Sequence, residues 1–401
     1  MLTILCIASY FKGEDFLRAC KATGSKVLLI TGKKLEDKDW PRESVDEFFY
    51  VEESTPGVWN MDNVISGLAW VMRRHKVDRI VALDDFDVEK ATLLRESFRI
   101  PGMGQTTGRF FRDKLAMRMR AAEMGVPVPG FSPLFNDDEI NAFIAQYPGP
   151  WLVKPRSEAS ATGIRKVHNG HELWEAVHAL GDHRHNYLVE QFKPGGVYHV
   201  DALSRGGEVI FSRVSKYLNP PFDVAHGGGI FQTATVPFGS EDDQALQALN
   251  AQVMKAFRMQ HSASHTEFIR CHEDGKYYFL ETASRVGGAH IAEMVEVSSG
   301  INLWAEWAKL EVAVAQGITY ELPAIRNDHA GIIISLARQQ YPDTSGFQDA
   351  EIVWRMSRDH HVGLIMQSPS HERVITLLNE YAGRIFADFH ASAPVPDRPS
   401  A

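Results

Sequence analysis

The first hundred residues alternate short apolar runs with helical stretches. The runs TILCIASY (3–10) and KVLLITG (26–32) flank one helical stretch, and DRIVALDD (78–85) is followed by another, VEKATLLRESF. Apolar runs of this length, alternating with amphipathic helices, are typical of parallel strands covered on both faces. The alternation predicts a three-layer α/β unit up to about residue 110. The first turn, SYFKGEDF, has a single glycine and therefore lacks the G-x-G-x-x-G pattern of dinucleotide-binding folds.

A different pattern begins after a predicted helix near residue 113. Asp113 is placed to cap a helix that runs to Met124, Gly125 ends this helix, and Pro127 and Pro129 force an extended exit. A compact α+β module follows, and after Gly196 the chain turns to antiparallel strands that end in a hairpin with the turn HEDGK. We expect an N-terminal α/β domain, a linker helix with a small module, an antiparallel-sheet domain, a small C-terminal subdomain and a mobile tail, over residues 1–112, 113–190, 191–330, 331–392 and 393–401.

Composition narrows the classes of protein. The 401 residues include 42 Lys and Arg against 51 Asp and Glu, which gives a formal net charge of −9. Proteins that hold a nucleic-acid backbone need an excess of basic residues, so that class is disfavoured. The three cysteines form no CxxC pair, the N-terminus lacks a basic leader, and no apolar run reaches the roughly 18 residues of a membrane span. We therefore expect a cytoplasmic protein that acts on small molecules, with neither nucleic acid nor membrane as a partner.

Two glutamates lie on the two strands of the late hairpin. Glu267 and Glu281 flank the Asp274-Gly275 turn, which brings them near each other if they share a face. Both have apolar neighbours, where two unpaired anions are costly, and a cation such as Mg²⁺ would relieve that cost. Arg285 follows, and its fork suits a phosphoryl or carboxylate oxygen. The alternative is an exposed hairpin whose acids only increase solubility.

Two lysines lie upstream of these acids. Lys154 ends the apolar run WLVKP directly before the small-residue loop SEASATG, and Lys114 opens the predicted helix. Small residues let main-chain N–H groups approach a phosphate, and a neighbouring lysine adds positive charge. The Walker A pattern is absent. Each lysine alone also fits an ordinary surface position, so the informative feature is the order of the lysines and glutamates along the chain.

Taken in that order, these motifs resemble the ATP-grasp superfamily of carboxylate ligases. The matching segments, between about residues 78 and 310, are RDK…GVPVPGF, WLVKPRSEASATGI, YLVEQFKPGGVYHVD and TEF…DG…FLETASRVGG. The resemblance implies an ATP-grasp fold of mixed α/β and α+β class, with a parallel N-terminal domain, a lid module and an antiparallel catalytic domain. It also implies bound ATP and Mg²⁺, with Mn²⁺ as a substitute ion, and a homodimer, which is usual in related enzymes.

The resemblance assigns roles to individual residues. Glu267 and Glu281 would hold the metal ion, and Arg285 would stabilise the transferring phosphoryl group. The ATP contacts would come from the two lysines, from the loop that closes over the phosphates and from the hinge strand beside the adenine, namely Lys114, Lys154, Ser160, Thr162, Gly163, Glu190, Gln191, Phe192 and Lys193.

Two positions depart from the family pattern. Ala283 stands where an asparagine metal ligand is common, so a second Mg²⁺ would have fewer protein ligands. Val197 stands where a ribose-binding glutamate is common, which leaves the ribose contact unassigned, with Asp201 and His199 as guesses.

The stretch ETASRVGGAHIAEMVEVSSGINL looks most like the L-amino acid ligases, which make dipeptides. The likeness implies that Ser284, Gly287 and Gly288 line the substrate pocket. His226, before three glycines in the loop 219–231, is a candidate to bind a carboxylate or to take a proton from the amine, or else a solvated loop residue.

The expected reaction joins a small carboxylate to an amine through an acyl phosphate and releases ADP and phosphate. Two alternatives stay open at this point. One is a biotin-carboxylase-like enzyme that uses bicarbonate, and the other is an ATP-binding protein without catalytic activity.

Overall fold

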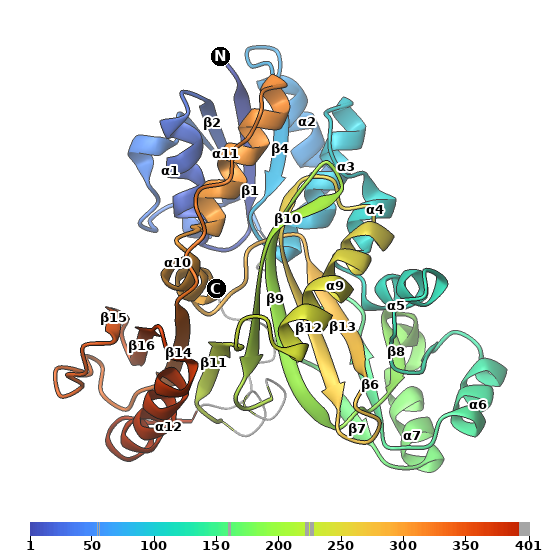
Figure 1. Ribbon diagram of the computed structural model, residues 1–401. Helices are drawn as coiled ribbons and strands as arrows, with labels where there is room; N and C mark the ends of the chain where they lie inside the picture. Colours follow the sequence, from blue (N-terminus) through green and yellow to red (C-terminus); the bar gives the residue numbers. More distant parts are fainter. Residues whose placement is uncertain (54, 56, 159–161, 221–223, 225–227, 393–401) are drawn as a thin grey trace.

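The computed structural model describes the whole chain except residues 54, 56, 159–161, 221–223, 225–227 and 393–401. Three β-sheets organise the described part, and helices cover them (Figure 1). The parallel start and the antiparallel continuation predicted from the sequence are both confirmed. None of the helices in the described ranges has the length and apolar content that crossing a membrane requires.

A parallel sheet in the order β3-β2-β1-β4 forms the N-terminal part. Alternate residues of β1 face opposite cores. Ile4 and Cys6 pack towards α1 and α11 (Leu303–Gln316), whereas Leu5 and Ile7 pack towards α2 and α3, which explains the continuous apolar run. The elements of this part are β1 (Thr3–Ala8), α1 (Glu14–Ala22), β2 (Lys26–Gly32), β3 (Glu47–Val51), α2 (Met61–Val71), β4 (Arg79–Ala82), α3 (Val88–Phe98) and α4 (Gln105–Arg109).

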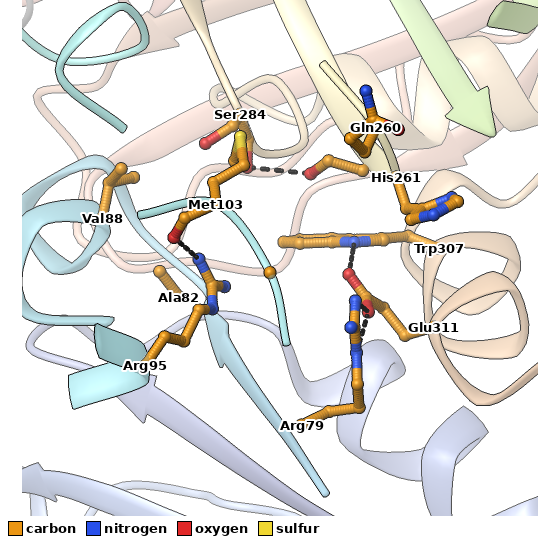
Figure 2. A pocket seen from close by; sticks show the side chains of 12 residues that line it. Arg79, Ala82, Val88, Arg95, Met103, Gln260, His261, Ser284, Trp307 and Glu311 are labelled. Atoms are coloured by element: carbon orange, nitrogen blue, oxygen red, sulfur yellow. Dashed lines mark hydrogen bonds and ion pairs between the residues drawn. The ribbon is translucent and has the colours of Figure 1, made fainter. Parts of the chain in front are cut away.

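Helix α11 (Leu303–Gln316) contacts both α1 beside this sheet and the strands β9 (Gly195–Arg205) and β12 (Ser262–Cys271) of another sheet. Although it lies late in the sequence, it packs beside α1, and the rings of Trp307 and Phe16 are 4.9 Å apart between centroids (Figure 1). Arg79 of β4 donates to one carboxylate oxygen of Glu311, with Nε at 2.9 Å and Nη2 at 2.5 Å. Figure 2 shows this buried ion pair beside a cavity of about 30 Å³.

Replacing Glu311 with glutamine is expected to lower the free energy of unfolding by about 3 kcal/mol, because the Arg79 charge stays buried without a counter-ion. Denaturant unfolding of wild type and variant measures the loss. The matched control is Glu43→Gln, which removes the same charge from an exposed pair with Arg18 and should cost less than about 1 kcal/mol. A loss at Glu311 no larger than that of the control would refute a stabilising role for the buried carboxylate.

A small antiparallel sheet in the order β5-β8-β6-β7 follows the linker helix α5 (Lys114–Glu123). Helix α5 begins and ends as predicted. The Asp113 side chain accepts from two main-chain N–H groups of its first turn, and Gly125 has a φ of +73° just beyond its end. The elements of this module are β5 (Phe131–Pro133), α6 (Asp137–Gln146), β6 (Trp151–Pro155), β7 (Arg165–Val167), α7 (Gly170–Leu180) and β8 (Tyr187–Gln191).

The largest sheet is antiparallel and has the order β13-β12-β9-β10-β11-β14-β16-β15. Three strands and a helix follow from residue 329 onward, and these strands extend the same sheet. The sequence boundary at residue 331 stays a prediction. The elements are β9 (Gly195–Arg205), β10 (Glu208–Tyr217), β11 (Phe231–Thr235), α9 (Glu241–Ala256), β12 (Ser262–Cys271), β13 (Tyr277–Ala283), α10 (Ile291–Ser299), β14 (His329–Leu336), β15 (Ile352–Arg355), β16 (His361–Ser368) and α12 (His371–Asp388).

Candidate active site

The late hairpin places its two glutamates directly opposite each other. In the antiparallel pair β12–β13, Glu267 is the register partner of Glu281, so both side chains lie on one face of the sheet. Cβ atoms of directly opposed residues are about 4.5–5.5 Å apart. The hydroxyl of Tyr217 donates to Glu267 Oε1 at 2.9 Å and fixes that carboxylate. The hairpin therefore presents two sets of hard oxygen atoms to one small volume.

Lys114 neutralises Glu281. Its Nζ lies 2.7 Å from Glu281 Oε2 and donates to the main-chain oxygen of Glu158 at 2.6 Å. Burial alone would raise the pKa of Glu281, but attraction to Lys114, and then to Lys154 and Arg118, lowers it to about 2. The carboxylate is therefore anionic and already compensated by a cation. Carboxylate oxygens on two facing strand positions fit the ligand preference of Mg²⁺.

Lys154 forms a second ion pair, with Glu190 of β8. Lys154 Nζ donates to Glu190 Oε1 at 2.6 Å, and both side chains are buried. Burial lowers the pKa of Lys154 to about 8, against the attraction of Glu190. Arg118 donates through Nε to the other oxygen of this carboxylate. Glu190 lies on β8, the predicted hinge strand, and its carboxylate bonds two cations, Lys154 and Arg118.

Among the described residues, one main-chain N–H of the segment 191–193 has no acceptor in the chain. The N–H of Gln191 donates to Gly130 O at 2.7 Å, and that of Phe192 donates to Pro150 O at 3.0 Å. Lys193 is the remaining residue of the predicted stretch, and its N–H has no main-chain acceptor among the described residues. If this strand contacts adenine through N–H groups, Lys193 is the position that offers one.

The predicted phosphate-covering loop is described only at its two ends. Ser160 lies outside the described residues, whereas Thr162 and Gly163 lie on the turn that leads into β7. Gly163 has a φ of +72°, and a Cβ atom there would approach Pro155 Cγ to 2.9 Å. This conformation and this close approach both require glycine. Closure of the loop over phosphates stays a prediction.

Arg285 faces the N-terminal sheet. Its Nη1 donates to Val286 O at 2.7 Å, and its Nη2 pairs with Asp85, which follows β4. Arg285 Nε and Asp85 Oδ1 are buried and have no hydrogen-bond partner within the described part of the chain. Asp85 was not among the sequence candidates. The sequence signal that could have identified Asp85 is its position at the carboxyl end of a parallel strand, where ligands bind in such sheets.

The predicted substrate residues occupy different surroundings. A Cβ atom on Gly287 would lie 2.8 Å from Asp201 Oδ1 and 3.0 Å from His265 Nδ1, whereas Gly288 faces open space. Ser284 lines the cavity of about 30 Å³ shown in Figure 2. Their role in a substrate pocket stays a prediction, as does that of His226, which lies outside the described residues.

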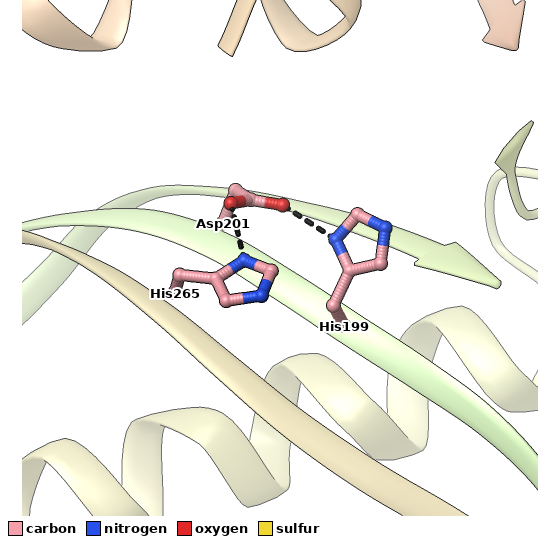
Figure 3. A group of neighbouring side chains, drawn as sticks. All are labelled: His199, Asp201 and His265. Carbon is pink, nitrogen blue, oxygen red and sulfur yellow. Dashed lines mark hydrogen bonds and ion pairs between the residues drawn. The ribbon is translucent and has the colours of Figure 1, made fainter. Parts of the chain in front are cut away.

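His199, Asp201 and His265 form a hydrogen-bonded cluster of side chains on β9 and β12 (Figure 3). His199 Nδ1 and His265 Nδ1 donate to the two oxygens of Asp201 at 2.6 and 2.9 Å, and His265 Nε2 lies 3.7 Å from Glu267 Oε1. These three side chains are close enough to suggest a metal site, but both Nδ1 atoms already bond the carboxylate. His199 and Asp201 are also fully buried, so neither offers a group to a ribose.

No family model matches the chain. The L-arginine-specific L-amino acid ligase of Bacillus subtilis is 27% identical over 242 residues, which cover 59% of this chain and 58% of that protein. The chain therefore spans less than two thirds of the length of this curated relative. The sequence likeness to L-amino acid ligases is confirmed over that part.

Two solved structures match nearly the whole chain. The L-amino acid ligase from Bacillus licheniformis has a TM-score of 0.76 at 18% identity and covers 97% of this chain and 98% of that one. The biotin carboxylase domain of 2-oxoglutarate carboxylase from Hydrogenobacter thermophilus, solved as a dimer with MgADP and bicarbonate, has a TM-score of 0.69 at 17% identity, with coverages of 94% and 88%. At these identities the two likenesses establish the fold.

Proposed function

We propose that this chain, which has the ATP-grasp fold predicted by its motifs, is an ATP-dependent carboxylate–amine ligase. The supporting observation is a pair of lysine–glutamate ion pairs, one at each of the two antiparallel sheets. Lys114 pairs with Glu281 of the large sheet, and Lys154 pairs with Glu190 of the small one. Each ammonium has three N–H donors, so in this proposal it binds a phosphate oxygen in addition to its carboxylate. The similarity to L-amino acid ligases supports amide formation as the reaction.

In the first step, a substrate carboxylate oxygen attacks the γ-phosphorus of ATP. The bond to the β,γ-bridging oxygen breaks, ADP leaves and an acyl phosphate remains. The protein contributes mainly positioning and charge compensation. Lys114 and Lys154 donate to phosphate oxygens through N–H groups that their glutamates leave free, and Arg285 donates to the transferring phosphoryl group. Mg²⁺ held by Glu267 and Glu281 would compensate further phosphate charge.

In the second step, an amine attacks the acyl carbon and phosphate leaves. The amine loses a proton as the amide forms, and His226 is the proposed acceptor. Ser284, Gly287 and Gly288 form the proposed substrate wall. The loop from Ser157 to Gly163 excludes water, which would otherwise hydrolyse the acyl phosphate. The carboxylate substrate is an amino acid or another small acid.

We also propose an assembly, a location and a metal preference for the protein. The chain acts as a cytoplasmic homodimer, binds no nucleic acid and accepts Mn²⁺ in place of Mg²⁺. The dimeric biotin carboxylase domain from Hydrogenobacter thermophilus, which shares the fold, supports this assembly. Light scattering of the purified protein measures the assembly.

The direct experiment is a substrate panel. Purified protein with Mg-ATP is offered the twenty amino acids singly and in pairs, and ADP, phosphate and new masses are measured. We expect ADP release that depends on the amino acid, together with the mass of an amide. ADP release that responds only to bicarbonate would favour the biotin-carboxylase-like alternative, which has less support because one curated sequence relative is an amino acid ligase. Nucleotide binding without turnover on any acid would favour the non-catalytic alternative.

A further inference from the structure

Arg118 is a fully buried arginine that bridges two sheets. It lies on helix α5, donates through Nε to the carboxylate of Glu190 in the small sheet, and donates through Nη1 to the main-chain oxygen of Leu280 in the large sheet. Leu280 directly precedes Glu281 in the sequence. One side chain therefore connects the carboxylate that holds Lys154 to the strand that carries the proposed metal ligand.

Helix α5 aims two cations at the same region. Lys114 and Arg118 are four residues apart, so they share one face of the helix. Lys114 reaches the Glu281 side chain, and Arg118 reaches the backbone just before it. The start of the helix is fixed to the small sheet, because the N–H of Lys114 donates to Arg156 O at 2.8 Å and the Arg156 side chain pairs with the capping Asp113. The helix is thus anchored to both sheets.

We infer that Arg118 is a positioning residue for the nucleotide. It fixes Glu190 and the Leu280–Glu281 backbone at one separation, so that Lys154 and Glu281 engage the same polyphosphate and its metal ion. This inference rests on the proposed function, because it requires a nucleotide between the two sheets. Arg118 acts through these neighbours, and we assign it no contact with the reacting atoms.

The geometry requires a guanidinium. Its planar, rigid group donates in two directions at once, to a carboxylate on one side and to a carbonyl on the other. A lysine keeps the charge but has one nitrogen, which cannot span the same two acceptors in the same fixed geometry. Nη2 of Arg118 is buried and has no partner among the described residues, so the group also keeps one donor for a water molecule or a ligand atom.

The test compares Arg118→Lys with Arg120→Lys. Arg120 lies on the same helix and also donates to a main-chain oxygen, that of Ala256, but it bonds neither Glu190 nor Leu280. Mg-ADP affinity is measured by calorimetry and the unfolding midpoint by denaturant. We expect Arg118→Lys to weaken Mg-ADP binding about tenfold or more, as removal of groups that orient ligand-binding residues does. Arg120→Lys should leave the affinity unchanged.

A thermodynamic cycle separates positioning from packing. In a Glu190→Gln background, Arg118→Lys should cost clearly less affinity than in the wild type, because the link is already broken. If the lysine variant does not fold, Arg118→Gln, which keeps a donor for Leu280 O, takes its place. If the wild type binds Mg-ADP and a folded Arg118 variant binds it equally tightly, this inference is wrong and the proposed function is unaffected. A wild type that binds no Mg-ADP would overturn the proposed function and this inference with it.

Discussion

Glu281→Gln is expected to lower Mg-ATP turnover about 10³-fold, the scale seen when a group that stabilises transition-state charge is removed. Glutamine keeps the shape of the side chain but loses the charge that pairs with Lys114 and that would bind the metal ion. The substitution does not change the main-chain pairing of residue 281 with Glu267, so the hairpin should still form. Turnover is measured as ADP release, and circular dichroism checks the fold.

The matched control for Glu281 lies on the same hairpin. Glu273→Gln removes the same charge from the exposed turn between β12 and β13, where the side chain faces solvent. This variant should keep wild-type turnover. If Glu281→Gln and Glu273→Gln behave alike, the assignment of Glu281 as a metal ligand is wrong.

Arg285→Lys is expected to lower kcat about 10²-fold while the KM for ATP changes little. Lysine keeps the positive charge, so ground-state attraction to ATP is retained. Lysine lacks the planar guanidinium with its three nitrogens. In this structure the guanidinium of Arg285 bonds Val286 O and Asp85, and its Nε has no partner among the described residues. An interaction made mainly in the transition state lowers kcat when it is removed, whereas an interaction made equally in the ground state raises KM.

Arg270→Lys is the control for this substitution. Arg270 lies on β12, in the hairpin that precedes Arg285 in the sequence, and pairs with Glu241 and Asp242 at the surface. Its replacement should change neither kcat nor KM. A variant of Arg285 that weakens ATP binding and leaves kcat intact would show that the arginine binds nucleotide and does not stabilise the transferring group.

The sequence predicted the parts of the site that local signals encode. The Asp274-Gly275 turn fixes a short hairpin, and this hairpin predicted that Glu267 and Glu281 lie opposite each other. Asp113 before α5 and Gly125 after it set the ends of that helix, because caps act within one turn. These features depend on residues close together in the chain, so a single sequence contains them.

The contacts that the sequence did not predict join distant segments. Asp85 and Arg285 are 200 residues apart, and Arg118 is 162 residues from Leu280. An arginine on an amphipathic helix fits an exposed position equally well, and only the packing of two sheets around α5 makes it buried. The packing of α11 beside α1 has the same origin, since two apolar helix faces do not identify each other in one sequence.

The most direct test of the central claim follows an oxygen atom. With the acid identified by the substrate panel and labelled with ¹⁸O in its carboxylate, Mg-ATP and the amine are added, and the released phosphate is analysed by mass spectrometry. An acyl phosphate transfers one carboxylate oxygen to phosphorus, so we predict one ¹⁸O atom in the inorganic phosphate and ADP as the nucleotide product. Unlabelled phosphate, or label in AMP, would contradict a ligase that works through an acyl phosphate.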